Sequence, residues 1–284
     1  LNNDGSPDID FNTTTAAGNG IIYQIAQQTD GKIIIAGSFT TYNGTTVNRI
    51  ARILSNGSLD SSFSTGSGTS ANITNIEIQP DGKIILAGNF IAFNGVSANR
   101  IIRLNPDGTS DTSFNSGSGF NDDCAALILQ DDGKILVGGK FTQYDGFNAN
   151  RIIRLNTDGS IDSGFLSGSG LSNGMVYTIK TDISGNIMLG GSFSDLYNGT
   201  EVNRLALLNP NGTLKSDFDI GSGPASASVL ALSNDSDGSW YIGGSFSVFD
   251  SKNQGRLAKI DSEGLHDIGY LTAGVGFDNS VLKV

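Results

Sequence analysis

Residues 79–90 read QPDGKIILAGNF, and residues 99–109 read NRIIRLNPDGT. Versions of both stretches occur five times along the 284 residues. The first turn recurs, in phase, at Asp30, Asp81, Asp132, Ser184 and Asp237. These positions are separated by 51, 51, 52 and 53 residues. A fixed period near fifty residues indicates stacked supersecondary units of the size of a propeller blade.

One repeat contains four predicted strands. Residues 73–79 alternate apolar and polar side chains, which predicts a half-buried strand, and Asp81-Gly82 then predicts a two-residue hairpin. Residues 83–88 form an apolar strand whose small end, Ala-Gly, indicates close approach of a neighbouring backbone. A third strand spans 100–104, and a short fourth segment ends at Phe114. The sequence therefore predicts an all-β fold, a β-propeller of four-stranded antiparallel blades.

The repeats organise the whole chain, which we expect to be a single β-propeller. Five full repeats of about 51–53 residues span approximately 21–70, 71–121, 122–173, 174–227 and 228–277, with partial units at 1–20 and 278–284. Residues 1–11 match the end of a repeat, and residues 281–284 match a first strand. We expect the parent polypeptide to be longer, and an incomplete last blade is the alternative. A solenoid remains a weaker alternative, because solenoid repeats are usually shorter or helical.

The composition narrows the classes of partner. The net charge of −11 disfavours nucleic acid, because an acidic chain repels phosphate backbones. No stretch has the length of a membrane helix, so membrane insertion is not expected. The one cysteine, Cys124, stands at a strand position and is expected to be a buried free thiol. The one histidine, His266, lies beside a turn and off the repeat pattern, where a catalytic role is the less favoured interpretation.

The quoted motifs carry a family resemblance over nearly the whole chain. Residues 79–90 and 99–109, followed by Asp111 and Phe114, resemble the delta-60 repeat, a β-propeller repeat of bacterial and phage proteins. The fifth copy departs most, since Gln254-Gly255 precedes its arginine. The resemblance implies large secreted, surface-attached or virion-associated proteins. It implies no common chemistry and supplies no catalytic residues.

Two residue types recur in every repeat and are expected to be structural. The phenylalanines are Phe39, Phe90, Phe141, Phe193 and Phe246. The arginines are Arg49, Arg100, Arg151, Arg204 and Arg256. We expect each arginine to pair with a carboxylate or a carbonyl, for instance with Asp60, Asp111 or Asp162. A cationic ring that binds an anion is the functional alternative.

Candidate binding residues are loop aromatics and polar residues that break the repeat. They are Tyr42, Phe93, Tyr144, Tyr197, Phe249, Asp195, Glu201 and Lys252. An aromatic beside Asn or Asp could stack on a sugar ring, whereas the structural alternative is a ring wedged between blades. The off-pattern residues lie in the last two repeats, where we expect a binding surface if the protein has one.

Reactive groups are sparse. No Ser-His-Asp set, phosphate loop, dinucleotide fingerprint or metal cluster is visible, so we expect no catalytic residues, metal site or cofactor. Residues 234–238 read NDSDG, which resembles part of a calcium loop but lacks the bidentate glutamate of such loops, and a longer turn is the favoured interpretation.

The function expected from these observations is non-enzymatic. The protein would be a structural or recognition module on a bacterial surface, in a secreted adhesin or on a phage virion. Its partners would be other protein subunits or a surface glycan. The first alternative is a carbohydrate-active propeller enzyme, a glycosidase or lyase, which would need off-pattern carboxylates such as Asp122, Asp123, Asp195 and Glu201 to converge. The second alternative is a purely architectural spacer.

Overall fold

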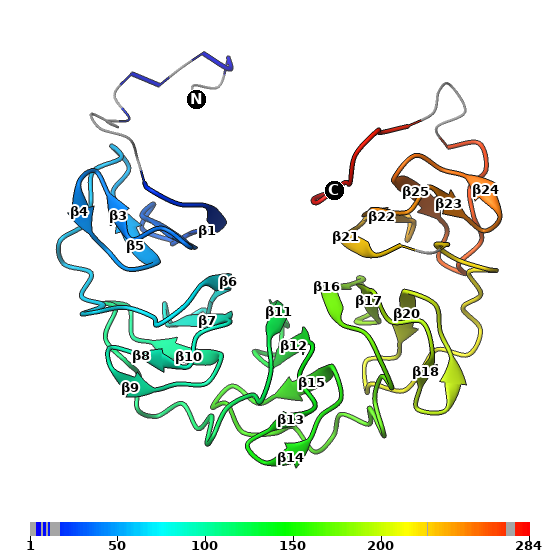
Figure 1. The fold of residues 1–284 in the computed structure, drawn as a ribbon, viewed down its shortest axis with the longest axis horizontal. Coiled ribbons are helices and arrows are strands. Elements are labelled where there is room, and N and C mark those ends of the chain that lie inside the picture. Colours follow the sequence, from blue (N-terminus) through cyan, green and yellow to red (C-terminus); the bar gives the residue numbers. More distant parts are fainter. Residues whose placement is uncertain (1–3, 7, 10, 12–17, 226, 271–275) are drawn as a thin grey trace. The chain divides into compact units, whose positions relative to one another are not determined.

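The computed structural model describes residues 4–6, 8, 9, 11, 18–225, 227–270 and 276–284. Within these residues every regular element is a β-strand (Figure 1). The strands form five three-stranded antiparallel sheets, and each sheet is accompanied by a two-stranded hairpin. The expected all-β propeller repeat is confirmed. The chain divides into two compact units, residues 1–124 with 158–160 and residues 125–157 with 161–284, and its organisation as one propeller domain stays a prediction.

The first unit holds the first two blades. The first blade contains β1 (Ile22–Gln27), β2 (Ile33–Gly37) and β5 (Ile50–Ile53), with the hairpin β3 (Thr41–Tyr42) and β4 (Thr45–Thr46). The second blade contains β6 (Ile73–Ile78), β7 (Ile84–Gly88) and β10 (Ile101–Leu104), with the hairpin β8 (Ala92–Phe93) and β9 (Val96–Ser97).

The second unit holds the other three blades. The third contains β11 (Cys124–Leu129), β12 (Ile135–Gly139) and β15 (Ile152–Leu155), with β13 (Gln143–Tyr144) and β14 (Phe147–Asn148). The fourth contains β16 (Val176–Thr181), β17 (Ile187–Gly191) and β20 (Leu205–Leu208), with β18 (Leu196–Tyr197) and β19 (Thr200–Glu201). The fifth contains β21 (Val229–Asn234), β22 (Trp240–Gly244) and β25 (Leu257–Ile260), with β23 (Val248–Phe249) and β24 (Lys252–Asn253).

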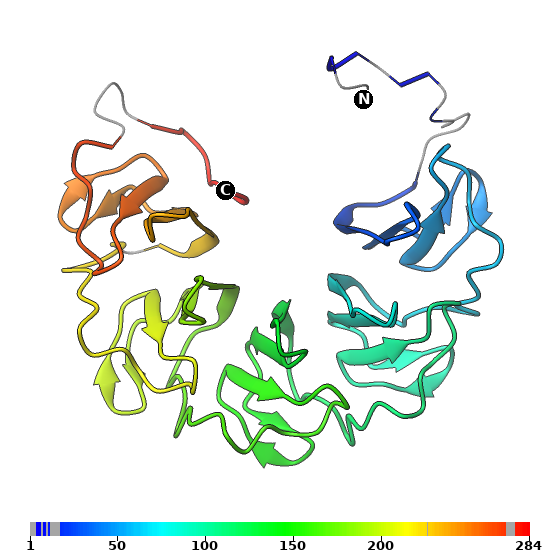
Figure 2. The ribbon, with the colours of Figure 1, turned by 180° about the vertical axis from the view of Figure 1, so that it is seen from behind.

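The fourth strand of each blade is shorter than the sequence suggests. It is reduced to a single bridge beside the third strand, as in Leu104↔Ser110 and Leu208↔Leu214. Conversely, residues 91–99, for which no strand is predicted, contain the hairpin β8–β9. In both views each hairpin lies on the far side of its blade from the first strand (Figures 1 and 2). Each repeat therefore presents its hairpin at one end of the blade.

The glycine pairs at the end of the second strands explain how neighbouring blades fit together. A Cβ on Gly191 would lie 2.0 Å from the Met175 carbonyl oxygen of the adjacent strand, which confirms the predicted close backbone approach. A Cβ on Gly190 would meet the Val229 side chain of the next blade at 2.6 Å. Val281 approaches Gly243 in the same way, at 2.7 Å, although residues 281–284 form no regular strand.

The recurring arginine that begins each third strand has an unusual backbone. Arg49, Arg100, Arg151, Arg204 and Arg256 all have φ between 61° and 72°. Main-chain hydrogen bonds to the end of the second strand hold this strained backbone in place. The Arg100 N–H donates to Phe90 O at 2.8 Å, and the Arg100 carbonyl accepts from the Gly88 N–H. Its side chain donates from Nη1 to Phe120 O at 3.1 Å. The equivalent arginines of the first, third and fourth blades likewise donate to carbonyls of the segment that crosses to the next blade, whereas Arg256 donates to Ser245 O of its own blade.

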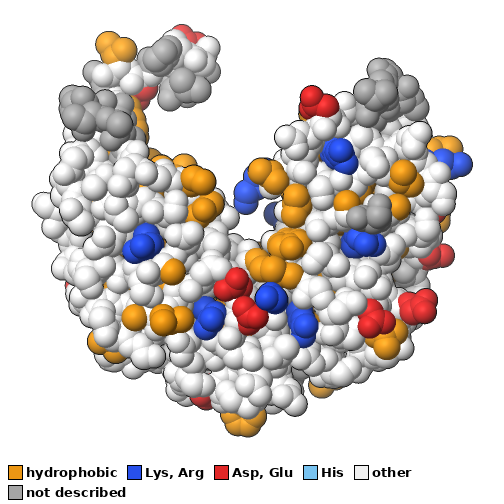
Figure 3. Space-filling view, viewed as in Figure 1, with side chains coloured by type: hydrophobic (Ala, Val, Ile, Leu, Met, Phe, Trp, Pro, Cys, Tyr) orange, Lys and Arg blue, Asp and Glu red, His pale blue; other side chains and the backbone are white. Residues whose placement is uncertain are grey.

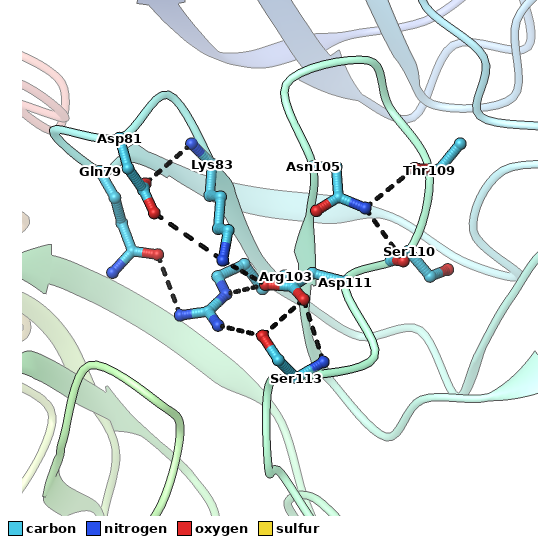
Figure 4. Close-up of polar contacts among 9 residues, drawn as sticks. All are labelled: Gln79, Asp81, Lys83, Arg103, Asn105, Thr109, Ser110, Asp111 and Ser113. Atoms are coloured by element: carbon cyan, nitrogen blue, oxygen red, sulfur yellow. Dashed lines mark hydrogen bonds and ion pairs between the residues drawn. The ribbon is translucent and has the colours of Figure 1, made fainter.

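The first four arginines of this series pair with carbonyls, which is one form of the expected pairing, but the pairing with Asp60, Asp111 and Asp162 that was given as an example is wrong. Those carboxylates bind a second arginine, three residues further along the strand, where the side chain points toward the fourth segment. Arg103 Nε donates to Asp111 Oδ2 at 2.7 Å, and Lys83 Nζ lies 3.1 Å from the same oxygen (Figure 4). The Arg103 guanidinium also lies 4.8 Å from the Phe114 ring centroid. We call this arrangement the Arg–Asp–Lys node.

The node recurs in the first and third blades. Its members there are Arg52, Asp60 and Lys32, and Arg154, Asp162 and Lys134. Arg52 Nη1 also donates to Pro106 O in the second blade, and Arg154 Nη1 donates to Pro210 O in the fourth blade. The node is therefore both an ion pair within one blade and a tie to the next blade.

Hydrogen bonds in the node control the ionisation of its aspartate. Burial disfavours the charged form of Asp111, whose side chain is 8% exposed. Hydrogen bonds from the Ser113 hydroxyl and main-chain N–H, and from Lys83 and Arg103, outweigh burial and hold the pKa of Asp111 well below its usual range. The charged node therefore stabilises the folded state at neutral pH.

The first prediction concerns the strained arginine. Arg100→Ala should lower the free energy of unfolding by about 1–2 kcal/mol, because the bond to Phe120 O is lost while the positive φ remains. Arg100→Gly loses the same bond but removes the backbone strain, and should therefore be more stable than Arg100→Ala by roughly 1 kcal/mol. Urea unfolding of the two variants and the parent measures both differences. A glycine variant less stable than the alanine variant contradicts this account.

The second prediction concerns the node at low pH. Because the pKa of Asp111 is lower in the folded than in the unfolded chain, its contribution is complete above the unfolded pKa, about 3.9, and is lost as the pH falls. Asp111→Asn should destabilise the chain by roughly 3 kcal/mol at pH 7. The difference in free energy of unfolding between the variant and the parent should decrease steadily below about pH 4. Asp81→Asn, at an exposed turn of the same blade, is the matched control and should change little. A difference in free energy of unfolding that does not depend on pH would show that the charge of the Asp111 carboxylate is unimportant.

Candidate functional site: a groove on the fourth blade

The fourth blade lacks the node at all three positions. Lys215 donates its main-chain N–H to Leu207 O at 2.8 Å, as Asp162 does to Arg154 in the third blade. This register places Leu207 at the arginine position and Lys215 at the aspartate position. Asn186 follows the first turn where Lys134 does in the third blade. All three node positions are therefore changed together in the fourth repeat, and a leucine and a lysine replace the arginine–aspartate pair.

The replaced side chains have new partners. Lys215 Nζ lies 2.9 Å from the exposed Asp217 carboxylate, and Asn186 donates to Asp182 Oδ2 at 2.7 Å. Leu207 is 2% exposed and belongs to the apolar cluster around Trp240 of the fifth blade. The fourth and fifth blades are therefore joined at this point by apolar packing.

A cavity of about 700 Å³ opens where the node would be. Its inner surface is apolar, with Leu205 and Leu207 buried and Val202, Leu214, Phe218 and Ile220 half-buried. Its outer surface is polar, with the exposed residues Ser194, Asp195, Thr200, Glu201, Ser216, Asp219 and Ser222. We call it the fourth-blade groove. On the face drawn in Figure 3, acidic and hydrophobic side chains lie close together over the part of the second unit that carries β18.

The second blade has a much smaller hollow at the matching positions. It measures about 150 Å³, and Phe93, Arg103, Asp111 and Phe114 are among its lining residues. Arg103 and Asp111 stand in the repeat where Leu207 and Lys215 stand in the fourth blade. Loss of the guanidinium fork thus accompanies the larger space. The chain itself supplies an internal comparison between a filled and an open version of one groove.

Two of the predicted binding residues lie together in the groove. Asp195 precedes β18, and Glu201 ends β19 directly across the hairpin, where it pairs with Leu196. Asp195 Oδ2 accepts a hydrogen bond from Ser172 Oγ at 2.9 Å, and the Glu201 side chain is exposed. Lys252 is exposed on β24 of the fifth blade and does not line this groove. The predicted off-pattern residues therefore divide between two hairpins.

The loop aromatics are not available to stack on a ligand, which corrects that part of the sequence interpretation. Tyr42, Phe93, Tyr144, Tyr197 and Phe249 are each at most 2% exposed. Tyr42 and Tyr197 donate their hydroxyl groups to Gly57 O and Gly212 O. Burial raises the pKa of both hydroxyls. The hairpin turns each ring inward, so the alternative of a wedged structural ring agrees with the geometry.

The remaining titratable candidates do not extend the groove. Cys124 is buried and free, as expected, and burial raises the pKa of its thiol. The His266 ring lies 5.1 Å from the Phe249 ring, and burial lowers the pKa of the imidazole. Asp235, in the segment that resembles a calcium loop, accepts a hydrogen bond from Tyr241. Among the described residues no three metal-ligating side chains come together.

Sequence reasoning missed Leu207, Lys215 and Asp219 as groove residues. The signal was present, because the pair at the arginine and aspartate positions changes from Arg154 and Asp162 to Leu207 and Lys215. This change was not recognised from the sequence, because the aspartates of the node were expected to pair with the other arginine of each repeat. A search for helices that could cross a membrane finds none among the residues that the structure describes.

Comparison with solved structures shows a shared fold. Virginiamycin B lyase from Staphylococcus aureus is 16% identical, with a TM-score of 0.52 over 89% of this chain and 70% of the lyase. A xyloglucanase from Xanthomonas campestris is 15% identical, with a TM-score of 0.51 over 88% of this chain and 38% of the enzyme. PorZ, a surface component of the Porphyromonas gingivalis type-IX secretion system, is 14% identical, with a TM-score of 0.47 over 78% of this chain and 30% of PorZ. No curated protein matches the chain.

Sequence comparison identifies the repeat directly. A family model described as a domain of unknown function, the DUF5122 beta-propeller, matches residues 28–63, 79–114, 130–165, 184–218 and 236–267. The first four matches end at the phenylalanines of the fourth segments, from Phe63 to Phe218. The matches contain both turns and all three node positions of each repeat. Together they cover more than half of the residues, and the chain therefore belongs to the DUF5122 β-propeller family.

Proposed function

We propose that the chain is a non-enzymatic recognition module on the outer surface of a bacterium, in a secreted adhesin or on a phage particle, as part of a longer polypeptide. Its partner is another protein or a surface glycan. The observation that carries this proposal is the fourth-blade groove, which opens at the positions that the node occupies in the first three blades. The resemblance of the repeats to the delta-60 repeat supports the proposed location outside the cell, because it implies secreted, surface-attached or virion-associated proteins.

The groove has the general form of a binding site. Its volume of about 700 Å³ lies within the usual range for ligand pockets, and it combines an apolar floor with a few polar groups at the rim. In the first three blades the node fills the corresponding positions. Its replacement by Leu207 and Lys215 in the fourth blade leaves an open surface, which supports a binding role for this blade.

A carbohydrate-active enzyme is the second candidate, and one observation favours it. Asp195, Glu201 and Asp219 line the same groove, whereas the sequence alone brought no carboxylates together. All three are exposed and come from one repeat. A general acid at neutral pH usually needs burial to raise its pKa, so the exposed arrangement supports recognition over catalysis.

Calorimetric titration against neutral and charged oligosaccharides and against short peptides, followed by product analysis, tests this proposal. We expect binding without release of reducing sugar or of an unsaturated product. Glu201→Gln should weaken binding, and Glu263→Gln, at an exposed turn outside the groove, is the matched control. Turnover that Glu201→Gln abolishes would move the protein to the enzyme class. Failure to bind any of these ligands would favour the remaining alternative, in which the chain is a purely architectural spacer.

A further inference from the structure

We propose that the fourth-blade groove binds an extended, basic peptide segment that inserts one apolar side chain. This inference rests on the proposed recognition function and specifies its ligand. It follows from three features of the groove, which are its apolar floor, its acidic rim and the strand at its edge.

The floor of the groove is suited to an apolar side chain. Leu205 and Leu207 form its buried part, and the half-buried Phe218 stands at the position where Phe114 contacts Arg103 in the second blade. In that blade the chain's own arginine lies over the ring. In the fourth blade Leu207 and Lys215 replace the arginine and the aspartate, and Lys215 is paired with the exposed Asp217, so the floor offers no carboxylate to a cation. An uncharged, apolar group is therefore favoured at the floor.

The rim of the groove is suited to positive charge. Asp195, Glu201 and Asp219 are exposed around the opening. The one basic side chain of the groove, Lys215, is paired with Asp217 at 2.9 Å and adds little net positive charge. The whole chain carries −11, which strengthens attraction of cations over longer range. A ligand with basic residues on either side of an apolar one matches this distribution.

The edge of the groove favours a peptide over a sugar. Thr200 and Glu201 of β19 line the groove, and within the described residues β19 pairs with β18 alone. A strand with one neighbour has main-chain groups on its other side that an extended peptide can pair with. Aromatic faces, on which sugars usually stack, are limited to the half-buried Phe218.

The probe for this proposal is a capped pentapeptide with a central phenylalanine flanked by arginines. Matched peptides replace the arginines by glutamates, or the phenylalanine by glycine. We expect the first peptide alone to bind, with an affinity that falls as salt is raised, because exposed charges are screened over about 10 Å at 0.1 M. Equal binding of the acidic peptide, or no binding of the basic one, overturns the proposal.

Two variants of the protein locate the binding. Glu201→Lys reverses one exposed charge and should weaken binding about tenfold or more, whereas Asp131→Lys makes the same change at an exposed turn of the third blade and should not. Leu207→Arg combined with Lys215→Asp restores the residues of the second blade and should abolish binding by filling the groove. Thermal unfolding establishes that each variant is folded. Unchanged affinity in Glu201→Lys shows that the peptide binds elsewhere and overturns the proposal.

The outcomes separate this inference from the proposed function. If the basic peptide fails but an oligosaccharide binds and Glu201→Lys weakens it, the recognition function stands and the peptide inference is wrong. If the chain turns over any oligosaccharide, the recognition function itself is wrong. If no peptide and no oligosaccharide binds, both are wrong.

Discussion

The buried contact of Arg103 with Asp111, flanked by Lys83 and Phe114, shows the interaction on which the first three blades depend. A single three-stranded sheet has two apolar faces and cannot cover both. The node solves part of this problem, because Arg52 and Arg154 hold a carboxylate of their own blade and a carbonyl of the next. Phe63 adds to the junction by lying against Gly108 of the second blade. Burying this ion pair costs desolvation energy. Additional hydrogen bonds offset this cost, because the hydroxyl and main-chain N–H of Ser62 donate to the second carboxylate oxygen of Asp60.

The same constraint explains why the fourth blade can differ. Apolar packing of Leu207 against the Trp240 cluster joins the fourth and fifth blades in place of the arginine. With the junction maintained by other means, the positions of the missing carboxylate and guanidinium are free to line a groove. The structural difference between the fourth blade and the first three thus follows from how one junction is stabilised. Surface residues such as Asp195 and Glu201 then give the groove its acidic character.

Much of the fold was predictable because the repeat presents each signal five times. Strand alternation, the Asp-Gly turns and the small residues before the loops all predicted the observed sheets. The candidate site was predictable only in part. Asp195 and Glu201 broke the repeat and were identified, but for Tyr197 and Phe249 the sequence left a ligand-stacking ring and a wedged structural ring as alternatives, and the rings are buried. Their loop contains a two-stranded hairpin, and its pairing turns the rings inward.

The sequence alone determined the number of repeats, the order of their strands, the buried thiol of Cys124 and the repeats that diverge. The tertiary structure decided which arginine meets which aspartate, and where the groove lies. The reason is that a repeat period shows which residues are equivalent, not which of them touch. Arg103 lies on β10 and Arg100 directly precedes this strand, yet Arg100, which has a positive φ, donates to the crossing segment, while Arg103 faces Asp111. Contacts of this kind depend on backbone geometry and on the neighbouring blade, and both exist only in the folded chain.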